Sequence, residues 1–464
     1  MARQRILIIS YSYAPQPTPR ALRWSSLANY WVERGMDVDI ITGWQNGLPE
    51  IEYTSGTTVY RVGRNLLTRL QSRLNSSPAA PTAPTTSQSR KSVPFKPVLK
   101  WLYDRTWKKL YWPDYACLWI KPAVRAARQL LKAHSYAAIV SVSDPFSGHV
   151  VAYRTRPLHN SAKWLVDIGD PFSFREAARP NNFDLYQNRN ITLESDVFGE
   201  CDAISVTTEG TAREYVSRFP NAKAKLTVIG PLMPAITNPV TLGAPAENRS
   251  VRKLVFVGTL YQGLRSPEYL LKLFVGLKRL PQHRDVELHI YGGVVGTSNL
   301  FDGVGDPSAN AIYVHGQVSR ERALEAMSDA DLLVNIGNTS AIQLPSKVVE
   351  YVWLGRPILN IASHDNDSSY EYLKGHPAML NLVARTSHVD PHHVAQLDSF
   401  MRVCPVVLPT SSLDSLRSRS RIDRIASQYA HALNLPIAVP EQVVNRIGTH
   451  YRRDSEISIR TPQV

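Results

Sequence analysis

The sequence predicts an α/β protein with two Rossmann-like domains, whose parallel sheets face each other across a cleft. Short apolar segments of strand length alternate with amphipathic segments of helical period in the first half of the chain, and this alternation restarts after residue 250. Residues 237–250 contain two prolines and no aromatic residue, which is typical of a linker. A chain of 464 residues is long enough for two domains of ordinary size.

The first domain is predicted at 1–236. Its opening strand at 5–10 is followed by a proline-rich loop and an amphipathic helix that ends at Gly35, and a strand at 36–42 comes next. A strand, a helix and a second strand in this order indicate a parallel βαβ unit. Further strands are expected at 138–142, 163–168, 203–206 and 225–229.

Two unusual segments interrupt this domain. Residues 76–89 are all Ser, Pro, Ala, Thr or Gln, a composition that cannot form a core, so 76–92 is predicted to be a disordered loop. The segment 95–132 interleaves Trp and Tyr with Lys and Arg. Between residues 61 and 132 there are 15 Lys and Arg and only two acids. This segment therefore carries nearly all of the chain's net charge of +14. This concentration of charge indicates an anionic partner.

The second domain is predicted at 251–409. Strands are expected at 253–257, 287–291, 312–315, 332–335 and 358–361, with helices between them. A helix at 411–433, within a C-terminal segment 410–435, is expected to return to the first domain. Residues 436–464 form a polar, basic tail.

Several classes of protein are disfavoured by the sequence. No apolar stretch approaches the roughly 18 residues that a membrane-spanning helix needs. The apolar stretch near the N-terminus is too short for a secretion signal. The three cysteines, Cys117, Cys201 and Cys404, are far apart and indicate neither a zinc site nor a disulfide framework. We therefore expect a protein of the reducing cytoplasm.

The richest candidate site lies in the second domain around Ser346, Lys347 and Glu350. A helix is predicted to begin here, because Pro345 suits a first turn and Gly355 suits a helix end. Free N–H groups and Lys347 at this end favour a phosphate, and Glu350 is placed to accept hydrogen bonds from ribose hydroxyls. Alternatively, Lys347 and Glu350 only pair with each other on an exposed helix.

A second candidate follows the first strand of this domain. Gly258 and Thr259 come directly after the strand, and Arg265 follows a few residues later. Glycine permits a close approach to the backbone, and arginine can bind a phosphate with two hydrogen bonds. The alternative is an exposed loop arginine. The sequence contains no G-x-G-x-x-G and no P-loop motif, so neither dinucleotide oxidoreduction nor P-loop ATP hydrolysis is favoured.

In the first domain, His149 and Asp170 are candidate catalytic residues, because each follows a predicted strand. His149 is placed to contact a substrate oxygen and Asp170 to orient a sugar hydroxyl; the alternatives are a structural histidine and a turn-capping aspartate. No metal site is expected, because the one histidine cluster, at 388–393, has no further ligands at suitable spacing.

Seven stretches resemble, in order, the family 4 glycosyltransferases of the GT-B fold. They include Ile-Leu-Ile-Ile-Ser-Tyr at 6–11, Asp-Ile-Gly-Asp-Pro-Phe at 167–172 and Leu-Pro-Ser-Lys-Val-Val-Glu at 344–350. The others lie at 21–24, 256–261, 314–321 and 330–335.

The resemblance implies transfer of a sugar from a nucleoside diphosphate donor, with retention of the anomeric configuration. It places the donor in the C-terminal domain and the acceptor mainly in the N-terminal one, and it implies no cofactor and no required metal. Glu350 matches the second glutamate of the family's E-x7-E motif. Ile342 stands in place of the first glutamate and Thr259 in place of an arginine, and residues 16–19 replace the glycine pair of the first loop. These departures suit a divergent or an inactive member.

The expected function is glycosyl transfer to a glycan or lipid-linked acceptor in surface polysaccharide or lipopolysaccharide biosynthesis. The aromatic and basic segment 95–132 is expected to dock peripherally on the anionic inner face of the membrane, and no nucleic acid partner is expected. Two alternatives stay open. One is a nucleotide-sugar 2-epimerase of similar architecture, and the other is a protein that binds nucleic acid through this segment.

Overall fold

The structure is a computed structural model that describes residues 3–54, 56–64, 106, 110–175, 179–233, 251–296, 299–302, 310–405 and 407–436. The predicted loop at 76–92 and linker at 237–250 lie outside the described residues. So do residues 437–464 of the predicted tail and, apart from Thr106, the part of segment 95–132 before residue 110.

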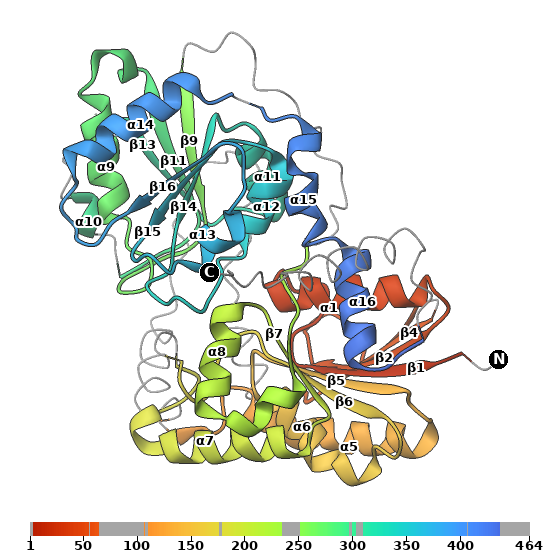
Figure 1. Cartoon of the computed structure of the whole chain (residues 1–464). Helices are drawn as coiled ribbons and strands as arrows, with labels where there is room; N and C mark the ends of the chain where they lie inside the picture. Colours follow the sequence, from red (N-terminus) through yellow and green to blue (C-terminus); the bar gives the residue numbers. More distant parts are fainter. Residues whose placement is uncertain are drawn as a thin grey trace, which may run out of the picture.

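An eight-stranded sheet forms the centre of the N-terminal domain (Figure 1). Its order is β3-β4-β2-β1-β5-β6-β7-β8, and every pair is parallel except β3 with β4. The strands are β1 (Arg5–Ser10), β2 (Asp37–Gly43), β3 (Ile51–Thr54), β4 (Thr57–Val62), β5 (Ala138–Val142), β6 (Lys163–Asp167), β7 (Ala203–Val206) and β8 (Leu226–Val228). Each strand predicted for this domain is present, whereas β3 and β4 add an unpredicted edge.

Helices cover both faces of this sheet (Figure 1). Side chains alternate along β1, so that Leu7 and Ile9 pack beneath α5, α6 and α7, while Ile6 and Ile8 pack beneath α1 and α16. The helices of this domain are α1 (Pro19–Val32), α5 (Cys117–Ala133), α6 (Ser147–Thr155), η1 (Arg156–Leu158), α7 (Phe183–Glu200), α8 (Glu209–Arg218), η2 (Pro220–Lys225) and α16 (Ile422–Ala432).

The C-terminal domain contains a six-stranded parallel sheet of order β13-β11-β9-β14-β15-β16, with a small β10-β12 pair beside it. The strands are β9 (Arg252–Val257), β10 (Leu260–Tyr261), β11 (Val286–Tyr291), β12 (Val294–Val295), β13 (Ile312–Gly316), β14 (Leu332–Ile336), β15 (Ile358–Ala362) and β16 (Met379–Val383). The five predicted strands are all present. All six strands are parallel, so the loops that follow β9, β13 and β14 lie together at the end of the sheet where the strands have their carboxyl ends. We call this end the carboxyl edge of the sheet.

Helices also flank this second sheet. They are α9 (Glu268–Lys278), η3 (Pro281–His283), α10 (Asn299–Asp302), α11 (Arg320–Ser328), α12 (Lys347–Leu354), α13 (Ser368–Leu373), α14 (Pro391–Val403), η4 (Thr410–Leu413) and α15 (Asp414–Ser418). None of the helices in the described ranges combines the length and the apolar composition that crossing a bilayer requires.

The helix predicted at 411–433 is instead two helices that belong to different domains. Leu413 and Leu416, in η4 and α15, pack in the core of the C-terminal domain, whereas α16 packs against α1 in the N-terminal domain. The chain crosses between the domains at Ser420. Its hydroxyl accepts a hydrogen bond from Trp353 Nε1 and its carbonyl accepts one from Met233 N. One straight helix could not fill both cores, so the helix is interrupted here.

A buried carboxylate holds α16 to the N-terminal sheet. Asp167, at the end of β6, accepts hydrogen bonds from Tyr429 of α16 at 2.7 Å and from Ser205 at 2.8 Å. It also accepts from Trp24 Nε1 and from Arg20 Nη1, both at 2.9 Å. Burial alone would raise the pKa of Asp167, but the nearby arginines and these hydrogen bonds outweigh it and hold the pKa below its ordinary value.

Candidate functional site

Loops at the carboxyl ends of strands from the two sheets contact each other directly. Loop 337–346 connects β14 to α12 in the C-terminal domain, and α8 follows β7 in the N-terminal domain. The hydroxyls of Thr208 and Thr211 both donate to the main-chain oxygen of Ile342, at 2.8 and 2.7 Å. The side chain of Gln343 donates to Asp170 Oδ1 at 2.7 Å. The candidate residues of both domains are therefore on neighbouring loops.

Asp170 lies in this contact region with its side chain about one third exposed. Besides the hydrogen bond from Gln343, Asp170 makes an ion pair with Arg175 at 3.2 Å, and the same guanidinium contacts Asp144 at 3.0 Å. The structure thus places the predicted catalytic aspartate at the boundary of the two domains, next to one cation and a second carboxylate. Its predicted role with an acceptor hydroxyl stays a prediction.

His149 is fully buried, in contrast to Asp170. Its Nδ1 lies 2.8 Å from Ser141 Oγ, and its Nε2 is buried without a hydrogen-bond partner among the described residues. Burial disfavours the charged imidazolium and lowers the pKa of His149 to about 3. The imidazole is therefore neutral and has no exposed atom for a substrate, which favours the structural alternative over the predicted catalytic role.

The loop after β9 brings Gly258, Thr259 and Arg265 together. Arg265 donates from Nη1 to the Thr259 carbonyl at 3.4 Å and from Nη2 to Asn338 Oδ1 at 2.8 Å. A Cβ atom at Gly258 would lie 3.3 Å from Arg265 Nη1, so glycine lets the guanidinium lie against the backbone. No carboxylate of the described residues forms an ion pair with Arg265, and its Nε is buried without a hydrogen-bond partner among them. This cation is suited to receive an anion.

The start of α12 carries the other predicted donor-site residues. Ser346 is the N-cap residue, but its side chain does not accept a hydrogen bond from the helix. Lys347 donates to Glu350 Oε2 at 2.6 Å, and Arg320, at the start of α11, lies 3.6 Å from Glu350 Oε1. The pairing of Lys347 with Glu350 is the alternative drawn from their spacing. Lys347 and Arg320 nevertheless bring two cations to one nearly buried carboxylate at the start of this helix.

A buried glutamate that the sequence patterns do not single out supports the N-terminal side of this contact region. Glu194 of α7 accepts hydrogen bonds from the Ser173 hydroxyl and from Tyr215 of α8, at 2.5 and 2.7 Å. Burial raises the pKa of Glu194 to about 7, although these hydrogen bonds oppose the shift. Glu194 thereby connects the loop that contains Asp170 to α8.

Four further contact residues are missed by sequence reasoning. Arg320 lies in a stretch used for the resemblance, but its distance from Glu350 depends on the fold. The hydroxyls of Thr208 and Thr211 and the amide of Gln343 are of types that are common on any surface, so no sequence signal distinguishes them.

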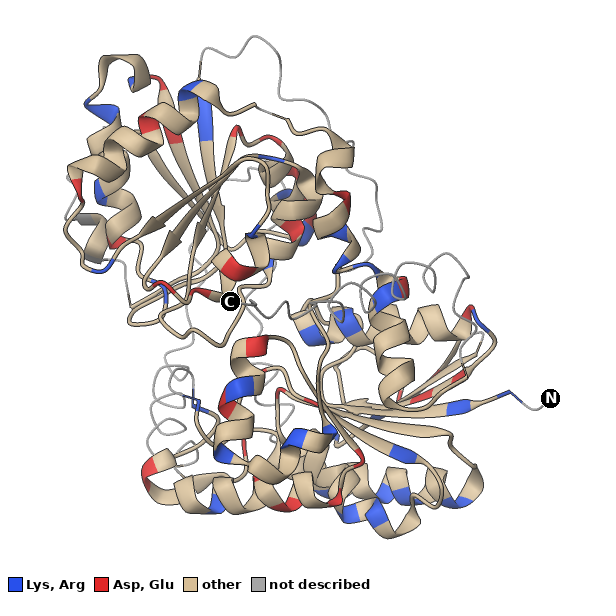
Figure 2. Ribbon diagram, in the orientation of Figure 1, with Lys and Arg blue, Asp and Glu red and all other residues tan. Residues whose placement is uncertain are grey.

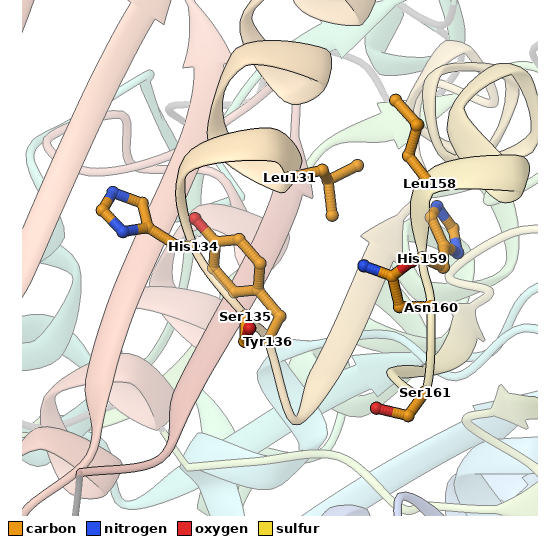
Figure 3. A pocket seen from close by; sticks show the side chains of 8 residues that line it. All are labelled: Leu131, His134, Ser135, Tyr136, Leu158, His159, Asn160 and Ser161. Atoms are coloured by element: carbon orange, nitrogen blue, oxygen red, sulfur yellow. The ribbon is translucent and has the colours of Figure 1, made fainter.

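A small cavity of about 40 Å³ lies near the amino ends of strands in the N-terminal sheet, away from the contact region described above (Figure 3). Tyr136 and His159 line it, close to the amino ends of β5 and β6. Because a buried water needs roughly 15 Å³, the cavity has room for a few waters but not for a sugar. No group of three potential metal ligands occurs in the part of the chain that the structure describes.

No protein-family model matches the sequence, and neither does any curated protein. The structure, however, is similar to solved structures over almost the whole chain. Sucrose-phosphate synthase from Thermosynechococcus elongatus matches with a TM-score of 0.59 and 13% identity, over 97% of this chain and 100% of that one.

Two further similar structures are a lipopolysaccharide galactosyltransferase and a protein solved in complex with UDP. The lipopolysaccharide outer core galactosyltransferase WaaB matches with a TM-score of 0.53 and 12% identity, over 92% of this chain and 99% of that one. Anabaena HepE in complex with UDP and glucose matches with a TM-score of 0.53 and 11% identity, over 93% and 100%. At these identities the likeness shows the fold alone, and the chain therefore has the GT-B fold.

Proposed function

We propose that this protein is a glycosyltransferase that moves a sugar from a nucleoside diphosphate donor to a glycan or lipid-linked acceptor, with retention of the anomeric configuration. The cationic edge of the C-terminal sheet carries this proposal. Arg265, Arg320 and Lys347 follow three different strands to that edge. Arg320 and Lys347 both contact Glu350, whereas no carboxylate of the described residues forms an ion pair with Arg265. Such an edge suits a diphosphate.

These residues have separate roles in the proposed reaction. Arg265 and Lys347 stabilise the negative charge that develops on the departing diphosphate, so this chain needs no added metal for that step. Glu350 accepts a hydrogen bond from a ribose hydroxyl in exchange for part of its contact with Lys347. Asp170 orients the acceptor hydroxyl at the boundary of the two domains.

The expected pathway is the synthesis of a surface polysaccharide or lipopolysaccharide. WaaB, a lipopolysaccharide galactosyltransferase, and HepE, which was solved with UDP-glucose, have the same fold and support this proposal. The shared fold does not select the nucleotide base or the sugar, because loop contacts determine both.

Thermal-shift measurements with UDP, GDP, ADP, TDP and CMP and their common sugar conjugates, without added metal, test the donor site. One nucleotide is expected to raise the melting temperature by several degrees at a concentration of about 100 times Kd. Binding at that level stabilises the folded state by about 2.7 kcal/mol. An absence of any shift across the whole panel would contradict the proposal.

A transferase and a 2-epimerase differ in what releases the nucleotide. The transferase is expected to release the nucleoside diphosphate only when an acceptor is added, whereas an epimerase needs no acceptor. Measuring diphosphate release with and without extracts of bacterial glycolipids therefore distinguishes the two activities.

We also propose that the protein works peripherally on the anionic inner face of the membrane, through helix α5. Figure 2 shows basic residues along this helix. Lys121, Arg125, Arg128 and Lys132 follow at intervals of three and four residues, so they lie on one helix face. All four are exposed, and within the described ranges none makes an ion pair. Helix α5 contains no acid at all.

Exposed apolar side chains precede this cationic face. Leu110, Tyr115 and Leu118 are 62%, 41% and 39% exposed. By contrast, Trp119 of the same segment is buried in the core, so the aromatic residues predicted to meet the membrane are partly structural. A row of cations beside exposed apolar residues suits a bilayer surface, where the cations contact lipid phosphates and the apolar groups enter the interface.

Reversing two charges on this face is expected to abolish most membrane binding. Arg125→Glu combined with Arg128→Glu should reduce flotation with phosphatidylglycerol liposomes at least tenfold, because each surface cation contributes about 1 kcal/mol. Arg284→Glu combined with Lys374→Glu, two exposed cations of the C-terminal domain, is the control. If the wild type fails to float at low salt, or instead binds single-stranded oligonucleotides tightly, the membrane proposal is wrong.

A further inference from the structure

Two threonines of the N-terminal domain hold one carbonyl group of the C-terminal domain. Thr208 is the N-cap residue of α8, and Thr211 lies in its first turn. Their hydroxyl oxygens are 2.9 Å apart, and both lie within hydrogen-bond distance of the Ile342 oxygen. A carbonyl oxygen has two lone pairs, so it can accept from both hydroxyls at once. This arrangement fixes the position of Ile342 relative to α8.

The backbone around this contact is closely packed. A Cβ atom added at Gly210 would lie 3.1 Å from the Ala341 oxygen and 3.5 Å from Ile342 Cα. A side chain at this position would therefore require loop 337–346 or α8 to shift by a few tenths of an ångström. A second polar contact, from Gln343 to Asp170, lies next to the threonine pair along the loop.

The same loop shapes the candidate donor site. Asn338 Nδ2 donates to the Gln343 oxygen at 3.0 Å, while Asn338 Oδ1 accepts from Arg265 at 2.8 Å. The loop then leads directly into Ser346 and α12. The Asn338 side chain therefore links the loop at Gln343 to the guanidinium of Arg265.

We propose that Thr208 and Thr211 are positioning residues for the donor site, although they belong to the opposite domain. They hold loop 337–346 so that Asn338 orients Arg265 and α12 begins at the correct place for the diphosphate. This inference rests on the proposed function for the identity of the ligand. The contact has a reciprocal consequence: a donor that favours this loop conformation also favours the contact between the domains.

Thr211→Val tests the proposal, because valine has nearly the shape of threonine but cannot donate a hydrogen bond. Two results are expected. Amide hydrogen exchange in the apo protein should become faster for peptides that cover 337–346. The Kd for whichever of UDP, GDP, ADP or TDP binds the wild type best should rise about fivefold, the effect of losing roughly one hydrogen bond.

Two variants complete the experiment. Thr211→Ser keeps the hydroxyl and should restore both wild-type exchange and wild-type affinity. Ser217→Ala, on the exposed side of the same helix, should change neither. Unchanged exchange in Thr211→Val, or an equal loss of affinity in Thr211→Ser, would overturn the inference. Failure of the wild type to bind any nucleotide would instead remove the proposed function, and the exchange result would still decide whether the hydroxyls hold the loop.

Discussion

Lys347→Ala is expected to reduce the rate of sugar transfer tenfold or more while leaving the fold intact. Lys347 supplies a full positive charge where the diphosphate leaves, and a tenfold loss corresponds to about 1.4 kcal/mol of transition-state stabilisation. Its side chain is partly exposed and, among the described residues, bonds only Glu350, so its removal creates no cavity in the core. The rate is measured as release of the nucleoside diphosphate with saturating donor and acceptor.

Lys374→Ala is a matched control, because Lys374 is an exposed lysine of the same domain. It should retain the wild-type rate. Glu350→Gln should also lower the rate at least tenfold, since the amide cannot replace the carboxylate between Lys347, Arg320 and the ribose. If Lys347→Ala and Glu350→Gln both retain near-normal rates, the donor site does not lie at the start of α12.

Asp167→Ala is expected to lower the free energy of unfolding by about 3–5 kcal/mol, because it leaves buried donors, among them Trp24 and Tyr429, without their acceptor. The corresponding fall in melting temperature is roughly 10 °C for a domain of this size. Urea unfolding and calorimetry measure the two quantities. Asp196→Ala, at an exposed position of α7, should change stability by no more than about 0.5 kcal/mol.

The stabilisation from Asp167 has a defined pH dependence. The pKa of Asp167 is lower in the folded protein than in the unfolded chain, so the folded state favours the charged form. The contribution is complete above the ordinary aspartate pKa of about 3.9 and is lost as the pH falls through the lower folded value. The stability difference between the wild type and Asp167→Ala should therefore shrink in strong acid. A difference that is constant down to pH 2 would contradict this explanation.

Much of the fold can be predicted from the sequence because the strands of parallel sheets are buried on both faces. Continuous apolar segments such as 6–9 and 254–257 therefore stand out. The exposed strand β3 has no such pattern and is missed. The interruption at Ser420 is missed for another reason: its cause is the position of two separate cores, and local helix propensity contains no information on them.

The candidate site is predictable where chemistry and local position coincide. Lys347, Glu350 and Arg265 follow strand ends or begin a helix, and the structure places them at one edge of the sheet. His149 satisfies the same rule but is fully buried. The rule fails here because a position near a helix start does not reveal which way the side chain points. Thr211 shows the opposite case, since only the contact between the domains gives its hydroxyl a partner.

The return of α16 to the N-terminal domain has a consequence during synthesis on the ribosome. Proteins usually fold domain by domain from the N-terminus as the chain emerges. Here Tyr429, which completes the surroundings of Asp167 and Arg23, emerges after every strand of the C-terminal domain. The domain that is translated first must therefore wait, with the part of its core that α16 covers still exposed beside α1, until the domain translated second has left the exit tunnel.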